Sequence, residues 1–193
     1  MIIDISQEIK KCKVYPGDPR PEVNRICDMK NGDSYNLSSF SMCAHNGTHV
    51  DAPSHFIKNG KSIDMIPLER FVGDCIVIST NNLITKDVAL EILTKAKFEG
   101  VDQRILIKGD GVVSEEAASL FAENNIWLIG TESQSVGPAD SPKKVHEILL
   151  SKNVVLLEGI NLKNVCDGVY FLCAQPLNIE GIEGSPCRAI LIK

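Results

Sequence analysis

Hydrophobic and polar positions follow a period typical of β-structure in the first 80 residues, where short apolar or alternating stretches lie between turn signals. Ile2–Ile5 is a short apolar run, and Asn36–Cys43 alternates so that Leu37 shares a face with two serines. Val72–Ser79 contains the run Cys-Ile-Val-Ile, which is typical of a strand that is buried on both faces. We therefore expect three strands in this part of the chain.

From residue 85 the apolar spacing becomes helical. Thr85 is a candidate N-cap for one helix, and a second helix is predicted to open at Ser114. Ser141 followed by Pro142 predicts the N-cap and first turn of a third helix that runs to about Ser151. The strands predicted between and after these helices are Arg104–Lys108, Ile126–Ile129, Val154–Leu157, Val169–Cys173 and Ala189–Ile192. This order predicts a mixed α/β domain, and two stacked sheets are one arrangement that the pattern allows.

Length and composition limit the classes of protein that remain. A chain of 193 residues without repeats or a flexible linker fits one domain spanning residues 1–193. The 44% hydrophobic content excludes a disordered chain, and no apolar stretch is long enough for a membrane span. Twenty basic and 25 acidic residues give a net charge of −5 without a cationic cluster, which excludes a general nucleic-acid binder.

The N-terminus and the cysteines both favour the cytoplasm. In the first eleven residues the acids precede the lysines, which is the reverse of a secretory signal. The seven cysteines are irregularly spaced and form no Cys-x-x-Cys motif. This pattern argues against a disulfide framework or a zinc ribbon and predicts reduced thiols.

Three of the four histidines lie between residues 45 and 55. His49 and Asp51 are two residues apart, so both point to one face if the segment is extended. The Asn-Gly pair after His45 can form a turn that brings this histidine to them, and imidazole and carboxylate are good ligands for zinc or a similar ion. His55 follows Pro53, which restricts the backbone, so His55 could lie near the metal without binding it. The alternative is a set of surface loop histidines.

Two further residues are candidates that are weak on their own. His146 falls in the helix predicted after Ser141, where a histidine is more often a packing residue. Glu158 directly follows a buried strand, and α/β proteins gather functional groups at the carboxyl ends of strands. Glu158 could equally be a capping or rim carboxylate.

The segment from His45 to His55 reads His-x-Gly-Thr-His-x-Asp-x-Pro-x-His. It resembles the signature of the cyclase family of metal-dependent hydrolases, which includes bacterial kynurenine formamidases and isatin hydrolases. His146, twelve residues before Glu158, matches the helix histidine and strand-end glutamate of that family. The resemblance runs nearly end to end, through Asp4-Ile5-Ser6, Tyr15-Pro16-Gly17-Asp18-Pro19, the stretch from Leu128 to Val136, and Gly184-Ser185-Pro186-Cys187-Arg188-Ala189.

The resemblance implies a fold and a ligand set. The family fold is a three-layer β/β/α swivelling-domain arrangement with mixed sheets, and its members are homo-oligomers, which implies a dimer or tetramer here. By resemblance, His45, His49 and Asp51 hold one metal ion, and Asp51, His146 and Glu158 hold a second. Zn²⁺ is the expected ion, with one or two per subunit, and Mn²⁺ is the alternative.

The implied function is hydrolysis of an amide C–N bond in an aryl formamide or a cyclic amide. His55 would act as general acid and base, and Tyr15 is a candidate for lining the substrate pocket, although it could also be an ordinary aromatic packed at a turn. Two alternatives share the site: a cyclase or dehydratase that acts on a polyketide-like substrate, and a non-catalytic metal-binding protein of the same fold. Glu132 and Gly137 stand where the family usually has aspartate, which bears on the substrate pocket.

Overall fold

The computed structural model describes residues 1–193, and nine of its strands form one continuous sheet. The strand order in the sheet is β1-β13-β11-β5-β7-β9-β10-β4-β12. The bounds are β1 Ile2–Asp4, β4 His49–Asp51, β5 Val72–Ser79, β7 Arg104–Lys108, β9 Leu128–Thr131, β10 Val155–Glu158, β11 Gly168–Cys173, β12 Gly184–Pro186 and β13 Ile190–Ile192. Two small sheets add β2 Glu22–Cys27 with β3 Leu37–Ser41, and β6 Leu83–Ile84 with β8 Val112–Val113.

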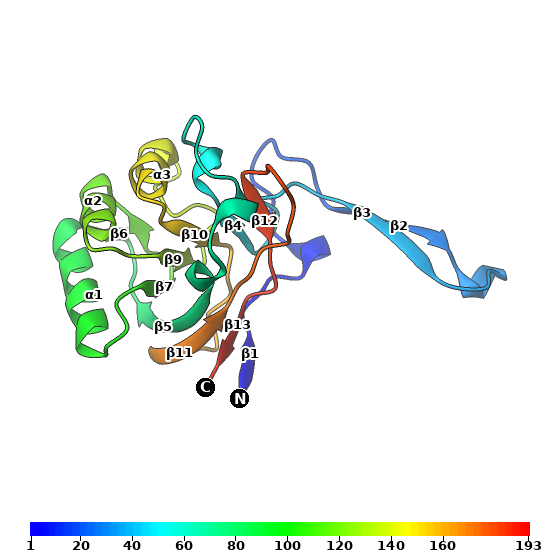
Figure 1. Ribbon diagram of the computed structural model, residues 1–193. Coiled ribbons are helices and arrows are strands. Elements are labelled where there is room, and N and C mark those ends of the chain that lie inside the picture. The colour runs from blue at the N-terminus through cyan, green and yellow to red at the C-terminus, as the bar shows by residue number, and fades with distance from the viewer.

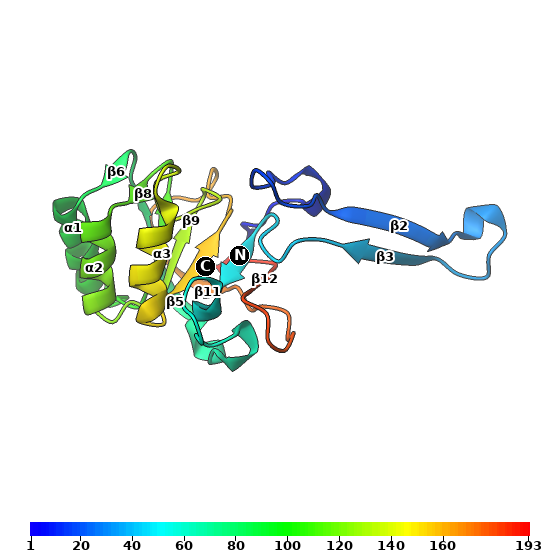
Figure 2. The same ribbon diagram turned by 90° about the horizontal axis from the view of Figure 1, so that it is seen from above.

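The middle of the large sheet is parallel and both of its ends are antiparallel. Strands β5, β7, β9 and β10 run parallel, while β11, β13 and β1 continue one end and β4 and β12 the other in antiparallel pairing. The helices α1 (Lys86–Phe98), α2 (Glu115–Glu123) and α3 (Pro142–Ser151) lie side by side on one face of the parallel part (Figures 1 and 2). No helix is long and apolar enough to cross a membrane.

Strand β5 shows how the sheet separates two hydrophobic cores. Ile76 and Ile78 pack into the core beneath the three helices, whereas Cys75 and Val77 point into a second core on the other face. This second core also contains Val50 of β4 and Leu191 of β13, which come from opposite ends of the sheet. The sheet therefore curls around the second core, and the mixed α/β fold with few helices is confirmed.

The predicted helices begin where the sequence places them. The Thr85 hydroxyl accepts a hydrogen bond from the Val88 N–H at 3.4 Å, and the Ser114 hydroxyl accepts one from Ala117 at 3.2 Å. The third helix begins at Pro142, although the Ser141 side chain makes no capping hydrogen bond.

The strands Val72–Ser79 and Arg104–Lys108 have the predicted bounds, and the other predicted strands differ from theirs by one or two residues. The strand expected at Ile126–Ile129 is found at Leu128–Thr131, because the N–H groups of Trp127 and Leu128 both bond to the Gln103 carbonyl before the strand pairing begins. β2 and the short pair β6 and β8 carry no comparable apolar pattern, and the sequence does not predict them. β12 falls within the Gly184-Ser185-Pro186-Cys187-Arg188-Ala189 motif, which resembles the closing strand of the family.

Strands β2 and β3 form a hairpin that projects far from the rest of the molecule (Figures 1 and 2). The strand expected at Asn36–Cys43 is present as Leu37–Ser41, but every residue of it is exposed. The hairpin therefore presents a set of large apolar side chains to solvent, namely Val23, Ile26, Met29, Tyr35, Leu37 and Phe40.

Candidate metal centre and active site

The pairing of β4 with β10 creates the centre of the site. Glu158 lies directly opposite His49 in this antiparallel register, and Asp51 follows two residues after His49 on the same face. The intervening Val50 and its neighbour Leu157 point into the second core. One face of the strand pair therefore packs into the second hydrophobic core, and the other face carries ionisable groups.

Close backbone contacts bring the ends of these two strands together. The Thr48 hydroxyl donates to the Gly159 carbonyl at 2.7 Å and accepts from the Gln7 N–H at 2.9 Å. Gly159 has φ +68°, and a Cβ there would lie 2.4 Å from the Gly47 carbonyl oxygen. Glycine at position 159 is therefore required both by the backbone conformation and by the close approach of the 47–48 segment.

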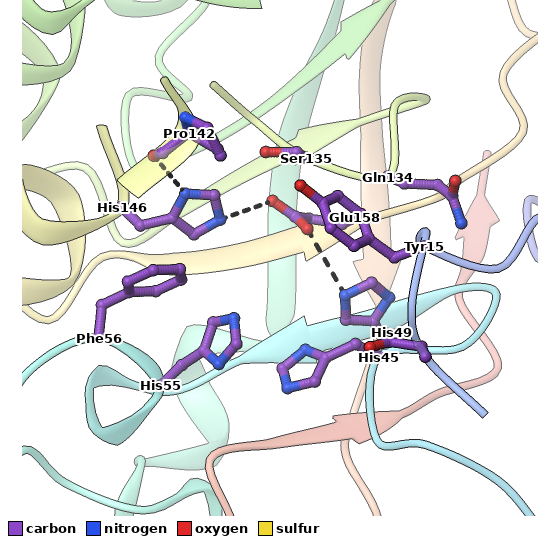
Figure 3. A pocket seen from close by; sticks show the side chains of 11 residues that line it. Tyr15, His45, His49, His55, Phe56, Gln134, Ser135, Pro142, His146 and Glu158 are labelled. Carbon is purple, nitrogen blue, oxygen red and sulfur yellow. Dashed lines mark hydrogen bonds and ion pairs between the residues drawn. The ribbon is translucent and has the colours of Figure 1, made fainter. Parts of the chain in front are cut away.

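His49 and His146 are oriented by backbone carbonyls. The Nδ1–H of His49 donates to Gly47 O at 3.0 Å, and the Nδ1–H of His146 donates to Pro142 O at 2.8 Å. Because a carbonyl oxygen can only accept, the proton of each ring is placed on Nδ1. Each Nε2 then points at the Glu158 carboxylate, at 3.5 Å from His49 and 3.3 Å from His146 (Figure 3).

Asp51 lies at the centre of the cluster and is completely buried. Its Oδ1 lies 2.9 Å from His45 Nδ1 and 3.5 Å from His49 Nε2. Its Oδ2 lies 3.8 Å from His146 Nε2 and has no hydrogen-bond partner. A buried carboxylate oxygen without a partner is costly, so this atom is a natural place for a cation to bind.

The close approach of imidazoles and carboxylates shifts the pKa values of His45 and Asp51. Burial lowers the pKa of His45, but hydrogen bonds to the Asp51 and Glu183 carboxylates outweigh it and raise the pKa to about 9. Burial would raise the pKa of Asp51, yet the His45 hydrogen bond and the charge of His49 hold it well below its usual range. The carboxylates of this cluster are therefore ionised at neutral pH.

The predicted ligands form two groups that could each hold a metal ion. The ligand atoms of His45, His49 and Asp51 all lie within 4.8 Å of one another, and so do those of Asp51, His146 and Glu158. Asp51 belongs to both groups. Imidazole nitrogens and ionised carboxylate oxygens are the donor set that zinc and similar divalent ions prefer. A bound ion would displace the protons that the raised pKa values of these imidazoles favour, so the residues fit a metal.

A cavity of about 250 Å³ opens beside these groups. His55 lines it, with its ring stacked on that of His45 at a centroid distance of 4.1 Å. His55 belongs to neither ligand group. Burial lowers the pKa of His55; Asp51 opposes this effect, and His45 and His146 add to it. Tyr15 also lines the cavity.

Several residues in or beside the cavity are not among the site candidates that the sequence predicts. Phe56 packs against His146 with a centroid distance of 4.6 Å, and Gln134 and Ser135 come from the segment after β9 (Figure 3). Glu183, whose Oε1 lies 3.2 Å from His45 Nε2, is separated from it by 138 residues. Only its place directly before the Gly184-Ser185-Pro186 motif could have drawn attention to it.

Glu132 and Gly137 lie outside the cavity, in an adjoining groove. The Glu132 carboxylate accepts hydrogen bonds from the N–H groups of Gly109 at 2.7 Å and Leu162 at 2.8 Å, so it ties two loops together. A Cβ at Gly137 would lie 3.0 Å from Val145 Cβ. Both residues therefore shape the surroundings of the site and leave the metal-binding groups untouched.

Comparison with known proteins places this geometry in a family. A protein-family model described as "Putative cyclase" matches residues 3–113. A kynurenine formamidase from Bacillus thuringiensis subsp. konkukian (strain 97-27) is 32% identical over 202 residues, covering 98% of this chain and 96% of the relative.

Solved structures share the fold over nearly the whole chain. A predicted metal-dependent hydrolase from Bacillus stearothermophilus superimposes with a TM-score of 0.81 and 28% identity, covering 99% of this chain and 97% of that one. Isatin hydrolase A from Labrenzia aggregata gives a TM-score of 0.82 over 99% of this chain and 93% of that one, and at 24% identity this shows the fold alone.

The resemblance seen in the His45–His55 segment is thus confirmed by matches along the whole chain. The family model covers more than half of the residues, and the relative covers nearly all of them at over 30% identity. This chain belongs to the cyclase family.

Proposed function

We propose that this protein is a metal-dependent hydrolase that cleaves an amide C–N bond in a small aryl formamide or cyclic amide. The observation that carries the proposal is the convergence of two potential ligand groups on Asp51 beside a cavity. The 32% identity to a kynurenine formamidase, over 98% of the chain, supports a formamide as the first substrate to test.

His45, His49 and Asp51 would hold one divalent ion, and Asp51, His146 and Glu158 a second. We favour Zn²⁺, with Mn²⁺ as the alternative, because three imidazoles and two carboxylates suit both. A divalent ion bound here supplies Lewis acidity, which lowers the pKa of a water molecule and polarises a carbonyl group. The unpartnered Asp51 Oδ2 supports this role for the cluster.

His55 would move the proton from the attacking water to the departing nitrogen. Its lowered pKa leaves the imidazole neutral near pH 7, which is the form that accepts a proton. Its stacking on His45 keeps the ring at the edge of the cavity, within reach of a substrate. The aromatic rings of Tyr15 and Phe56 would line the pocket for an aryl or cyclic substrate.

We also propose that residues 1–193 act as one domain and that the protein is a cytoplasmic homo-oligomer, a dimer or tetramer. The antiparallel pairing of β1 with β13 joins the two ends of the chain, which supports one domain. Seven unpaired cysteines support a reducing compartment. The projecting β2–β3 hairpin supports association, since an isolated two-stranded hairpin with exposed apolar side chains is marginally stable in water.

We expect the purified protein to hydrolyse small aryl formamides or lactams once loaded with Zn²⁺ or Mn²⁺. Chelation should reduce turnover to background, because the Lewis acid is removed, and re-addition of metal should restore it. The measurement is product formation across a panel of amides, lactams and esters. No turnover on any of them would favour the binding protein, and a cyclised or dehydrated product would favour the cyclase alternative.

Replacing His146 or Glu158 by alanine should lower the bound metal by about one equivalent per subunit, because each removes a ligand from the second group. Elemental analysis of chelator-stripped and reloaded protein measures this. Glu147→Ala, a neighbouring change on the same helix that touches neither group, is the matched control. If both variants keep the wild-type stoichiometry, the two residues have structural roles.

His55→Ala should retain its metal and lose activity by roughly 10²–10⁴-fold, the usual range for general acid–base catalysis. His49→Ala should lose both metal and activity, because the first group is then incomplete. Activity assays combined with metal analysis of the two variants separate the roles. Substantial metal loss in His55→Ala would make His55 a ligand.

Light scattering coupled to size exclusion should give a mass of at least two subunits. Phe40→Asp should shift the protein toward monomer, because a charge on an apolar hairpin surface opposes its burial. Phe98→Asp is the control, since Phe98 is also an exposed phenylalanine but lies at the end of α1, away from the hairpin. A monomeric wild-type protein would contradict the proposed assembly.

A further inference from the structure

His45 differs from the other two histidines of the cluster in how its ring is held. His49 and His146 each donate Nδ1–H to a backbone carbonyl and turn Nε2 toward the carboxylates. His45 does the reverse. Its Nδ1 faces Asp51 Oδ1 at 2.9 Å, while its Nε2 points out of the cluster toward Glu183 Oε1 at 3.2 Å.

The segment that carries Glu183 is built against the His45 ring. Glu183 O accepts a hydrogen bond from the Ala52 N–H at 2.8 Å, and Gly184 then pairs with Asp51 in the β12–β4 register. A Cβ at Gly184 would lie 2.8 Å from His45 Cε1, so the backbone at this position is in contact with the imidazole. Strand pairing therefore fixes the Glu183 main chain relative to the metal-ligand strand.

We propose that Glu183 is a positioning residue that holds His45 in the tautomer protonated on Nε2, so that Nδ1 is free to bind metal. Both ring nitrogens of His45 face carboxylates, and an ion bound at Nδ1 would displace the proton there. The imidazole would then keep one ring proton, which the Glu183 carboxylate holds on Nε2. Carboxylates that orient metal-bound histidines in this way typically change metal affinity 10–100-fold when removed. The inference rests on the proposed metal centre.

The same contact also bears on His55. The His45 and His55 rings stack at 4.1 Å with an interplanar angle of 26°. Without Glu183 the His45 ring keeps only Asp51 as a polar partner, so we expect its orientation, and with it the stacking surface for His55, to be less firmly fixed. Glu183 thereby couples the orientation of a ligand to that of the proposed acid and base.

The experiment measures the affinity for Co²⁺ by competition with a chelator, following the absorption of the bound ion. Glu183→Ala should weaken the affinity for one of the two Co²⁺ ions by about 10–100-fold and leave the affinity for the other ion unchanged. The reason is that only the first ligand group contains His45. Glu183→Gln, which keeps an oxygen acceptor without the charge, should lie between this variant and the wild type. The thermal midpoint of each protein shows whether the alanine variant is folded. If it is not, Glu183→Gln still tests the inference. Glu180→Ala, an exposed change on the same loop, should bind as the wild type does.

A second readout is the ring-nitrogen chemical shifts of ¹⁵N-histidine-labelled protein with Zn²⁺. We expect His45 to bind through Nδ1 and the other two ligands through Nε2. Affinities of Glu183→Ala within twofold of the wild type, or binding of His45 through Nε2, would overturn the inference while leaving the metal centre intact. If the wild type and Glu180→Ala take up no metal, the metal centre itself fails and the role of Glu183 fails with it.

Discussion

The buried carboxylate of Asp51 is the constraint around which the site is organised. A carboxylate that is fully removed from water needs compensating positive charge or hydrogen-bond donors, and three imidazoles converge on it from two separate parts of the chain. One of its oxygens remains without a hydrogen-bond partner. The cluster therefore accepts an electrostatic cost in the protein alone, and a bound cation would relieve that cost. Such local conflicts are typical of functional sites.

The sheet stabilises this arrangement because it separates polar from apolar side chains along the same strand. Val50 lies between His49 and Asp51 and packs into the second core, and Leu157 does the same beside Glu158. Because side chains alternate across a strand, each residue that enters the site has a neighbour that anchors it. The well-packed apolar neighbours thereby fix the positions of the candidate ligand atoms of His49, Asp51 and Glu158. This fits the need of a metal site for ligands fixed by well-packed elements.

Local signals in the sequence were sufficient for the three helices, for most strands of the large sheet and for part of the site. Capping residues and helical spacing located all three helices, since Thr85, Ser114 and Pro142 act through their immediate neighbours. The spacing of His49 and Asp51 predicted that both point to one face, and β4 has them there. His146 and Glu158 were ambiguous on local grounds, and only the resemblance to a family linked them to the histidine segment.

The sequence by itself determined the three helices, most strands of the large sheet, the fold class and the residue types of a candidate metal centre, because periodicity, caps and a dense motif are encoded within a few residues. The tertiary structure decided what depends on contacts between distant segments. It pairs Glu158 with His49 across two strands, places Glu183 at the outer nitrogen of His45, and turns Glu132 into a tie between two loops. It also leaves the β2–β3 hairpin projecting with its apolar side chains exposed, whereas the sequence indicates only that β3 is a strand and that Leu37 shares a face with two serines. The physical reason is that alternation specifies which side chains share a face, whereas only the packed chain specifies what that face meets.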